Sequence, residues 1–334
     1  MLFRSVMSQK ELTELAQQIY GKSDERFKEL QSMYHATQIQ IEGIITQFVS
    51  DDDNWNLPAP KRLKEQLLSE LMTMYREADS GDQALIAVAM TGRSIATINE
   101  AVKVSAGIAL LSLAHQRRVQ LADTLQEIPQ QVRTVGYRKA TKKINHYFNR
   151  LNGRPPTTAE HEYELARRIP GKYHRVLAQK SVSKMVQKFG SGIDTDEAIN
   201  RNTVAMMNKV NDLVDRINVN HIKPQEYSRE LADMFTGSNS TSRGAVYNAE
   251  RLLRTESAYT FANALKDDFK RRKVKYFTNV SVLGSHTCKF CERMDGKTFK
   301  VSDMQPGVNC APFHPNCQCD IVESTKEDIE SISL

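Results

Sequence analysis

Apolar residues recur at intervals of three and four along most of the chain, which is the spacing of amphipathic helices. A capping-box pattern at residues 8–11 precedes the first such run, which starts at Leu12. Pro58 and Pro60 interrupt the pattern, and it resumes at Leu63. We therefore expect the N-terminal part of the chain to consist of helices with a break near these prolines.

The longest apolar region covers residues 84–121, which are rich in Ala, Ile, Leu and Val and contain no Pro. This composition favours a buried helix or a pair of helices. The most apolar part, residues 101–114, is interrupted by Lys103 and is shorter than the roughly twenty apolar residues that cross a bilayer. We therefore expect core helices and no membrane contact.

Further helix starts are marked by polar residues or proline. Residues 157–160 form a second capping box, Asp194 and the acids after it predict another start, and Pro224 suits a first helical turn. Residues 236–244 are rich in Ser, Thr and Gly and predict a loop. A helix is expected from about residue 245 to residue 272.

The periodicity changes after residue 272, shortly before the cysteines. Apolar or β-branched residues alternate with more polar neighbours, as in a half-buried strand. The alternating positions are Val274, Tyr276, Thr278, Val280 and Val282. We expect these five side chains on the more apolar face of the strand.

These patterns predict a mainly α fold, with long helical N-terminal and middle regions and a small α+β module at the C-terminus. We divide the chain into a helical domain at residues 1–150, a basic helical region at 151–244, the C-terminal module at 245–322 and an acidic tail at 323–334. The chain has 334 residues, which is long enough to bury a hydrophobic core in at least one of these parts.

Basic residues concentrate in the middle of the chain. Residues 131–190 contain fourteen Lys and Arg against three acids, a net charge of +11, whereas the whole chain carries +6. Such a region attracts phosphate groups or an acidic protein surface. Nonspecific contact with double-stranded DNA, docking to an acidic protein and a set of solvated helix faces all remain open. The candidates for partner contact are Arg138, Lys139, Lys142, Lys143, Arg167 and Arg168.

All five cysteines lie within a short C-terminal stretch, between Cys288 and Cys319. The first residues of the chain lack the apolar segment of a secretory signal, so we expect synthesis in a reducing cytoplasm. Cysteines in that compartment are thiols or metal ligands and not a disulfide framework.

Two close pairs in this stretch have the spacing of a zinc site. Cys288 and Cys291 form a Cys-x2-Cys knuckle, and His314 and Cys317 form a second pair. Zinc binds four nitrogen or sulfur donors in a tetrahedron, and two such pairs supply them. Cys319 is an alternative to Cys317 as the fourth ligand. We expect structural zinc, because a module of roughly fifty residues has little core of its own.

Cys310 is a reserve ligand, but it lies seven residues before Cys317 and is the cysteine that we expect to remain outside the metal site. Unligated thiols, catalytic zinc and a redox dithiol are the other interpretations of this stretch. The deaminase His-x-Glu pattern and the metalloprotease His-Glu-x-x-His pattern are both absent from the sequence. We therefore assign no catalytic residue.

Residues 246–322 resemble the C-terminal domain of the Mu F-like minor head proteins, also called phage head morphogenesis proteins. The resemblance is carried by a series of segments and not by any one of them: Arg-Thr-Glu at 254–256, the predicted strand, Ser-His-Thr-Cys-Lys-Phe-Cys at 285–291, Met-Asp-Gly-Lys-Thr-Phe at 294–299, Pro-Gly-Val-Asn at 306–309, and Pro-Phe-His-Pro-Asn-Cys-Gln-Cys at 312–319. Two positions depart from the family pattern: His286 replaces the usual Arg, and Cys310 replaces a small apolar residue.

The resemblance implies a structural protein of a tailed-phage head and not an enzyme. Such proteins sit inside the head near the portal and support head assembly and DNA packaging or delivery. The implied partners are the portal protein, the scaffold, the major capsid protein and packaged double-stranded DNA.

Two other classes of protein also use paired cysteine knuckles. A zinc-stabilised nuclease of the HNH type would need a histidine general base beside a second metal site, and no His-His or Asp-His pair occurs near residues 288–319. A zinc-ribbon nucleic-acid binder would carry its basic residues on the zinc module, whereas most of them lie upstream.

Overall fold

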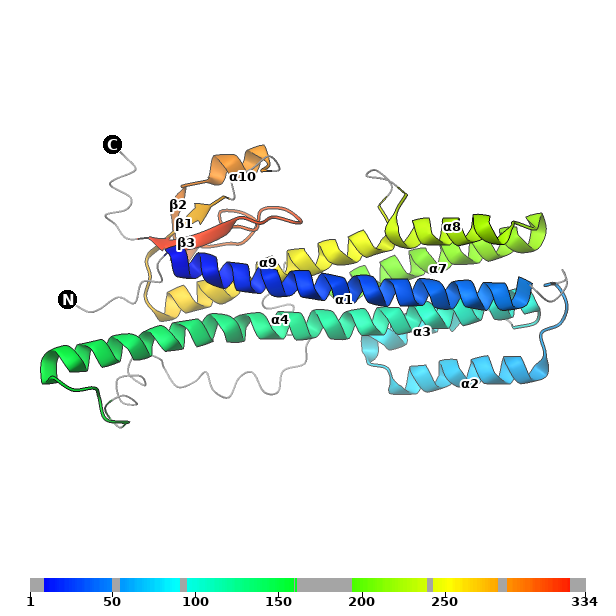
Figure 1. Cartoon of the computed structure of the whole chain (residues 1–334), viewed down its shortest axis with the longest axis horizontal. Coiled ribbons are helices and arrows are strands. Elements are labelled where there is room, and N and C mark those ends of the chain that lie inside the picture. The colour runs from blue at the N-terminus through cyan, green and yellow to red at the C-terminus, as the bar shows by residue number, and fades with distance from the viewer. Residues whose placement is uncertain are drawn as a thin grey trace. The chain divides into compact units, whose positions relative to one another are not determined.

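The computed structural model describes residues 9–49, 55–90, 95–158, 160, 194–238, 243–281 and 287–324, and they form a mainly helical structure (Figure 1). The helices are α1 (Gln9–Val49), α2 (Lys61–Glu77), α3 (Ser80–Met90), α4 (Ile98–Asn152), α7 (Thr195–Asn220), α8 (Pro224–Thr236), α9 (Ala245–Arg271) and α10 (Lys289–Met294). A short 3-10 helix, η2 (Val301–Asp303), and three strands, β1 (Tyr276–Val280), β2 (Thr298–Lys300) and β3 (Asp320–Ser324), complete the described elements. The predicted fold class is confirmed.

The chain divides into two compact units, each built from several segments. One unit contains residues 1–24, 122–193 and 252–334, and it includes the whole sheet and α10. The other contains residues 25–121 and 194–251, and it includes α2, α3, α7 and α8. The long helices α1, α4 and α9 each contribute residues to both units.

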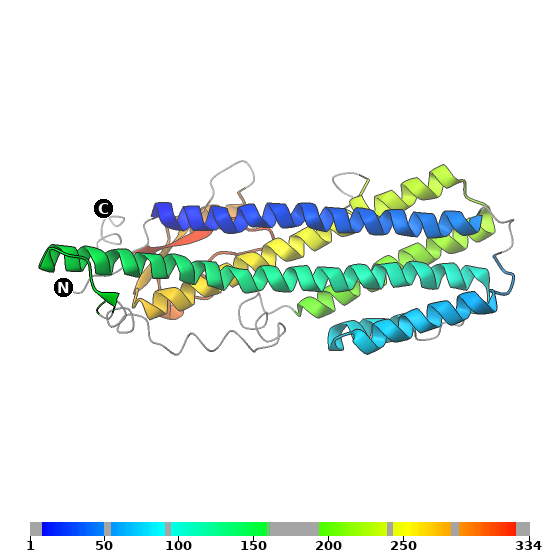
Figure 2. The ribbon, with the colours of Figure 1, turned by 60° about the horizontal axis from the view of Figure 1, so that its bottom comes forward.

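The predicted apolar region at residues 84–121 is a helix pair, α3 followed by α4. Helix α3 also lies beside α2 in both views (Figure 1, Figure 2). Helix α4 extends well beyond the predicted apolar region and passes through Pro129, which has no backbone N–H to donate within the helix. No described helix is long and apolar enough to cross a membrane.

Helix α7 begins at the predicted position because its N-cap is satisfied. The carboxylate of Asp194 accepts a hydrogen bond from the backbone N–H of Glu197 at 3.0 Å, which pairs one of the free donors at the helix start. Helix α8 likewise begins with Pro224, and α9 covers the predicted range to within one residue. These helix boundaries could be predicted from the residues close to them in the sequence.

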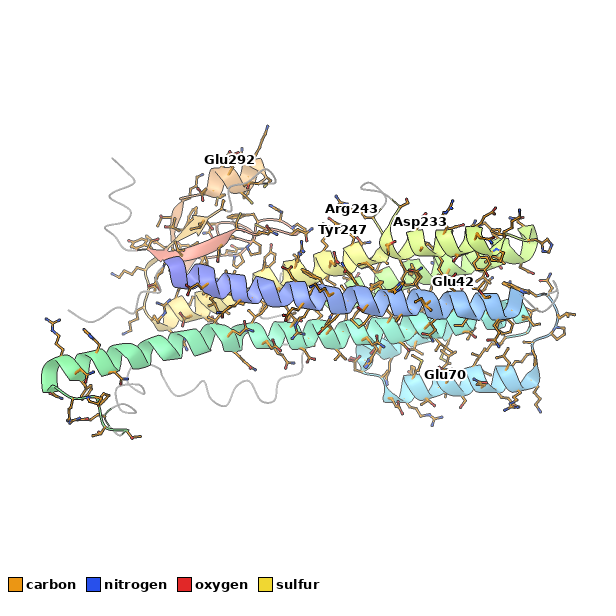
Figure 3. All side chains as sticks on the ribbon, viewed as in Figure 1. Glu42, Glu70, Asp233, Arg243, Tyr247 and Glu292 are labelled. Carbon is orange, nitrogen blue, oxygen red and sulfur yellow. The ribbon has the colours of Figure 1, made fainter. Side chains whose placement is uncertain are left out.

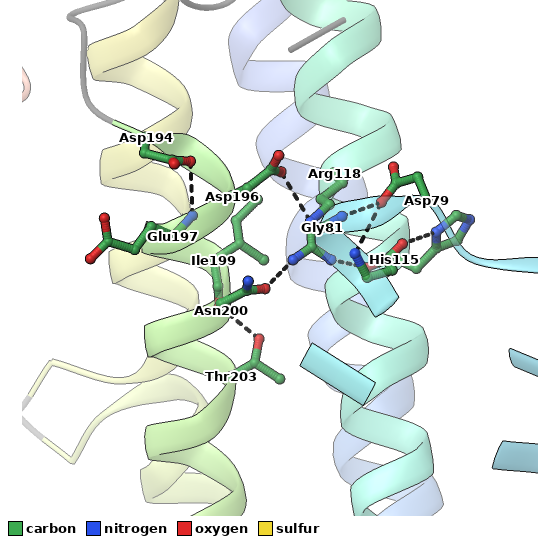
Figure 4. Close-up of polar contacts among 11 residues, drawn as sticks. Asp79, Gly81, His115, Arg118, Asp194, Asp196, Glu197, Ile199, Asn200 and Thr203 are labelled. Carbon is green, nitrogen blue, oxygen red and sulfur yellow. Dashed lines mark hydrogen bonds and ion pairs between the residues drawn. The ribbon is translucent and has the colours of Figure 1, made fainter. Parts of the chain in front are cut away.

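A buried arginine joins three helices of the second unit (Figure 4). The Arg118 side chain on α4 is only 8% exposed and forms an ion pair with Asp82 on α3. Its Nε donates to the carboxylate of Asp196 on α7 at 3.1 Å, and its guanidinium also donates to Asn200. On the other side of Asp82, His115 Nδ1 lies 2.6 Å from the carboxylate. We call these five residues the Arg118 cluster.

Polar contacts also connect α1 with α8 in this unit. Ser228 donates to the carboxylate of Glu42, which Figure 3 labels on α1. One turn further along α1, the hydroxyls of Thr46 and Tyr227 lie 3.0 Å apart. The Tyr227 ring is almost completely buried, so the helix pair combines an apolar contact with satisfied hydroxyl groups.

The three strands form an antiparallel sheet in the order β2-β1-β3. The strand was predicted correctly, but its buried face was not. Phe277 and Asn279 are completely buried, whereas Tyr276, Thr278 and Val280 are half-buried. The reason is that the Phe277 ring packs inward, 5.9 Å from the ring of Phe299 on β2, and Asn279 is accommodated by hydrogen bonds.

A buried ion network connects the end of α9 to β3. Asp268 is almost completely buried and pairs with Arg271 and Arg272. Arg272 also pairs with Glu323 on β3, whose side chain is 3% exposed. Buried carboxylates of this kind persist only when they are paired and hydrogen-bonded, so Arg272 fixes the sheet against α9.

Candidate metal centre

Two chain segments of the C-terminal module carry the predicted ligands. The first, residues 287–297, leads through α10 and is called the knuckle segment. The second, residues 305–319, leads to β3 and is called the return segment. β1 precedes the knuckle segment in the chain and is the central strand of the sheet.

The knuckle segment folds locally around its two cysteines. Cys288 is the N-cap of α10, and its Sγ accepts a hydrogen bond from the backbone N–H of Cys291 at 3.4 Å. This hydrogen bond is the main reason why the pKa of the Cys288 thiol is lowered from its usual value. The bond turns both sulfur atoms of the Cys-x2-Cys motif toward the same point.

Five donor atoms from the two segments converge. Cys291 Sγ lies 3.1 Å from His314 Nε2 and 3.7 Å from Cys317 Sγ. Within one group, the donors of Cys288, Cys291 and His314 lie within 4.8 Å of one another, and within a second group those of Cys291, Cys317 and Cys319 do. Cys291 belongs to both groups and is therefore the centre of the cluster.

The two groups differ in burial. Cys291, Cys317 and Cys319 are buried, whereas Cys288 and His314 are half-buried. Burial raises the pKa of the Cys291 thiol to about 12. The pKa of Cys317 is also raised, first by a hydrogen bond with Cys319 and then by burial. Free thiols are therefore protonated here, and a metal ion would have to displace those protons to bind.

One sulfur–sulfur distance of the cluster fits a tetrahedral zinc ion. With zinc–sulfur bonds of about 2.3 Å, two thiolates of one tetrahedron lie roughly 3.8 Å apart. The 3.7 Å separation of Cys291 and Cys317 matches this value. The donor set of thiolates and one imidazole is also the set that zinc prefers. Among the described residues, each group thus brings together three of the five predicted ligands, and the two groups share Cys291.

Cys310 lies outside both groups. It is completely buried, and its thiol donates to the carbonyl oxygen of Ala311 at 3.1 Å. Burial raises the pKa of this thiol, so it is a protonated core residue in the structure.

The structure does not describe the other predicted partner-binding side chains. The backbone of Arg138, Lys139, Lys142 and Lys143 belongs to α4, but their side chains are not described; Arg167 and Arg168 lie outside the described residues. His286 is outside them as well. Contact of the basic region with DNA or protein therefore stays a prediction.

Sequence reasoning missed two polar residues beside the metal centre, Asn279 and Ser281. Both are buried, and both contact the ligand segments through hydrogen bonds. The sequence contained a signal: Asn279 and Ser281 are polar residues two positions apart, at and just after the end of the last strand before the cysteine knuckle, and residues two apart in extended chain share a face.

Residues 209–322 match the family described as phage Mu protein F like protein. This range begins within α7 and contains both ligand segments, β1, β2 and the first three residues of β3. No curated protein and no solved structure matches the chain. The resemblance inferred from the sequence is confirmed in the C-terminal region, where residues 209–322 match this family.

Proposed function

We propose that this protein is a minor capsid protein of a tailed phage, a head morphogenesis protein located inside the head near the portal. The observation that carries the proposal is the family match over residues 209–322. The family is one of phage head proteins, which supports a role in the virion. The position near the portal and the support of DNA packaging or delivery go beyond the match and belong to the proposal.

The role of zinc in this proposal is structural. Cys288, Cys291 and His314 supply three donors, and Cys317 or Cys319 supplies the fourth. Zinc would link the knuckle segment to the return segment, each of which is too short to form a core alone. Because protein donors fill all four positions, no open position remains for a reacting water molecule.

The proposed partners are the portal protein, with the scaffold and the major capsid protein as further contacts. The basic residues of region 131–190 are proposed to contact packaged double-stranded DNA through its phosphates, without reading its sequence. Such binding weakens steeply as salt rises. A filter-binding titration at about 50 mM salt should detect it, and absence of binding at that concentration would remove the DNA contact from the proposal.

The location in the virion can be tested on phage particles. Purified particles should contain a few copies of this protein, which quantitative mass spectrometry would detect. Particles assembled without the gene should be defective in head morphology or DNA content, as seen by electron microscopy. If the protein is absent from purified particles and proheads, the proposed function is wrong.

A nuclease is the rival function from another class. A magnesium-dependent nicking assay on plasmid DNA distinguishes it, because a head protein without catalytic residues leaves the plasmid supercoiled. Among residues 287–324, His314 is the sole histidine, and it belongs to the cysteine cluster. The described part of the module therefore offers no histidine outside the cysteine cluster to act as a general base, and we favour the structural role.

A further inference from the structure

The inner face of the central strand lies between the two segments that carry the metal ligands. Phe277 and Asn279 lie on this face, Ser281 follows directly after the end of the strand at Val280, and all three are buried. Phe277 contributes to the apolar core. The other two are polar, and each forms hydrogen bonds to both neighbouring sides of the metal centre.

Asn279 is completely buried and uses its backbone and its side chain on different segments. Its backbone N–H donates to the carbonyl of Lys297 at 3.0 Å, and its own carbonyl accepts from Gly296 at 2.9 Å. These two bonds hold the end of the knuckle segment. Its side-chain amide donates to the carbonyl of Asn309 at 2.9 Å and accepts from the N–H of Ala311 at 3.1 Å.

The amide of Asn279 therefore fixes the return segment just before it reaches its ligands. Asn309 strengthens this connection, because its own side chain closes the loop by bonding to the carbonyl of Asp303 and the N–H of Gln305. All of the donor and acceptor groups of Asn279 named here are satisfied in a buried site, where an unpaired group is costly.

Ser281 also connects the two segments, and it does so through the ligand-bearing residues themselves. Its hydroxyl donates to the carbonyl of Cys291 at 2.7 Å, and the Cys319 thiol lies 3.5 Å from the same oxygen. Its backbone N–H donates to the carboxylate of Asp295 at 2.7 Å. Ser281 thus contacts one ligand-bearing residue of each segment, in addition to the turn that ends α10.

We infer that Asn279 and Ser281 are positioning residues of the metal centre, which hold the knuckle and return segments in the ligating geometry before a metal ion binds. The inference rests on the proposed zinc site. Ordering the two segments on binding would cost conformational entropy, and a strand that orders them in advance removes that cost from the binding free energy. Hydrogen bonds around metal ligands have this effect in general.

The opposite face of the same strand provides a matched control. Thr278 directly precedes Asn279 in sequence, but its side chain points to the other face, where its hydroxyl lies 2.6 Å from that of Thr298. It contacts neighbouring strands and neither ligand-bearing pair. Thr278→Val therefore removes partly buried hydroxyl hydrogen bonds from β1 and leaves the contacts of Asn279 and Ser281 in place.

The test measures zinc affinity of the full chain by competition with a chromogenic chelator. Ser281→Ala and Asn279→Ala should weaken zinc binding about 10- to 100-fold, whereas Thr278→Val should change it by less than about threefold. Ser281→Thr keeps the hydroxyl and should recover most of the affinity. Ser281→Ala removes only one hydroxyl and keeps the test valid if Asn279→Ala does not fold.

A second measurement does not depend on zinc. In metal-free wild-type protein, the amide of Ala311 should exchange its hydrogen slowly, and Asn279→Ala should abolish this protection. Wild-type affinity in Ser281→Ala and Asn279→Ala, an equal loss in Thr278→Val, or an unprotected Ala311 amide overturns the positioning role while the zinc site stands. Wild-type protein that binds no zinc overturns the zinc site itself, and the positioning role with it.

Discussion

Cys291 Sγ and His314 Nε2 lie 3.1 Å apart, although 23 positions separate the two residues in sequence. The contact therefore depends on the return of the chain after α10 and not on local geometry. The knuckle motif sets the direction of Cys291, while β1 sets the position of the segment that carries His314. Closing this loop costs entropy, which a shared metal ion and the hydrogen bonds of β1 both offset.

Replacement of a knuckle cysteine should remove the metal and destabilise the module. Cys288→Ser eliminates one thiolate donor while changing little else, because the residue is only half-buried. We expect zinc content to fall from about one equivalent to less than a tenth of an equivalent, with loss of folded structure in residues 276–324. Elemental analysis of purified protein and hydrogen exchange would measure the two effects.

The matched control for this change is Cys310→Ser, which replaces a cysteine outside both donor groups. It should leave zinc content at the wild-type value, although the buried hydroxyl lowers stability somewhat. A loss of zinc in this variant, or full zinc content in Cys288→Ser, would show that the ligand set is wrong.

The arginine that connects α9 with β3 should be essential for the stability of the module. Arg272→Met would leave Glu323 buried without this partner, and Asp268 with one partner fewer. Loss of one side of a buried ion pair typically costs about 3–5 kcal/mol. We expect a decrease of that size in the free energy of unfolding, measured by urea denaturation with zinc in excess.

Lys275→Ala serves as the control for the arginine variant, because Lys275 is an exposed residue just before β1. Its expected effect is within about 0.5 kcal/mol. If the two variants were equally stable, the ion network would contribute little to the free energy of unfolding, which would contradict its burial in the structure.

The Arg118 cluster predicts a non-additive pair of substitutions in the helical unit. Arg118→Met leaves the carboxylate of Asp82 in a buried site without its guanidinium partner, and we expect a loss of about 3 kcal/mol. Asp82→Asn in the same chain removes the carboxylate charge that has lost its guanidinium partner. The double variant should therefore be more stable than the sum of the single variants predicts, by about 1 kcal/mol or more. Thermal unfolding of the four proteins would measure this coupling energy.

The sequence was sufficient for features that depend on neighbouring residues. The start of α7 at Asp194, the extent of α9 and the grouping of the cysteines all follow from local patterns. The Arg118 cluster was not predictable in this way, because Asp82, Arg118 and Asp196 come from three helices that are far apart in the chain. Pairing of such residues depends on packing, which periodicity does not encode.

The buried face of β1 was predicted wrongly for a similar reason. The alternation of Tyr276, Thr278 and Val280 suggested that these side chains point inward, since β-branched residues pack well in sheets. The structure instead buries Phe277 and Asn279. A buried asparagine contradicts the apolar pattern, and only the return segment, which satisfies its amide, makes that face the inner one. Departures from the pattern of this kind are expected near functional sites.

Two glycines of the module allow backbone strain to be separated from steric contact. Gly307 and Gly296 both have positive φ, +89° and +70°, so alanine is strained at either position. A Cβ at Gly307 would also lie 2.7 Å from the hydroxyl of Tyr259, whereas one at Gly296 would meet open space. Gly296→Ala should thus cost about 1 kcal/mol of unfolding free energy, and Gly307→Ala measurably more.

The glycine comparison also bears on the metal centre, because Gly307 lies in the return segment and Tyr259 lies on α9. Gly307→Ala should displace the return segment from α9, so that His314 is held less firmly beside the other ligands. The rate of zinc release, measured by transfer to a chelator, should therefore increase. Gly307→Ala combined with Tyr259→Phe removes the hydroxyl that causes the contact and should bring the release rate back toward that of Gly296→Ala. Equal stabilities and release rates for the two single variants would mean that the tight packing of the return segment against α9 has no part in holding the ligands.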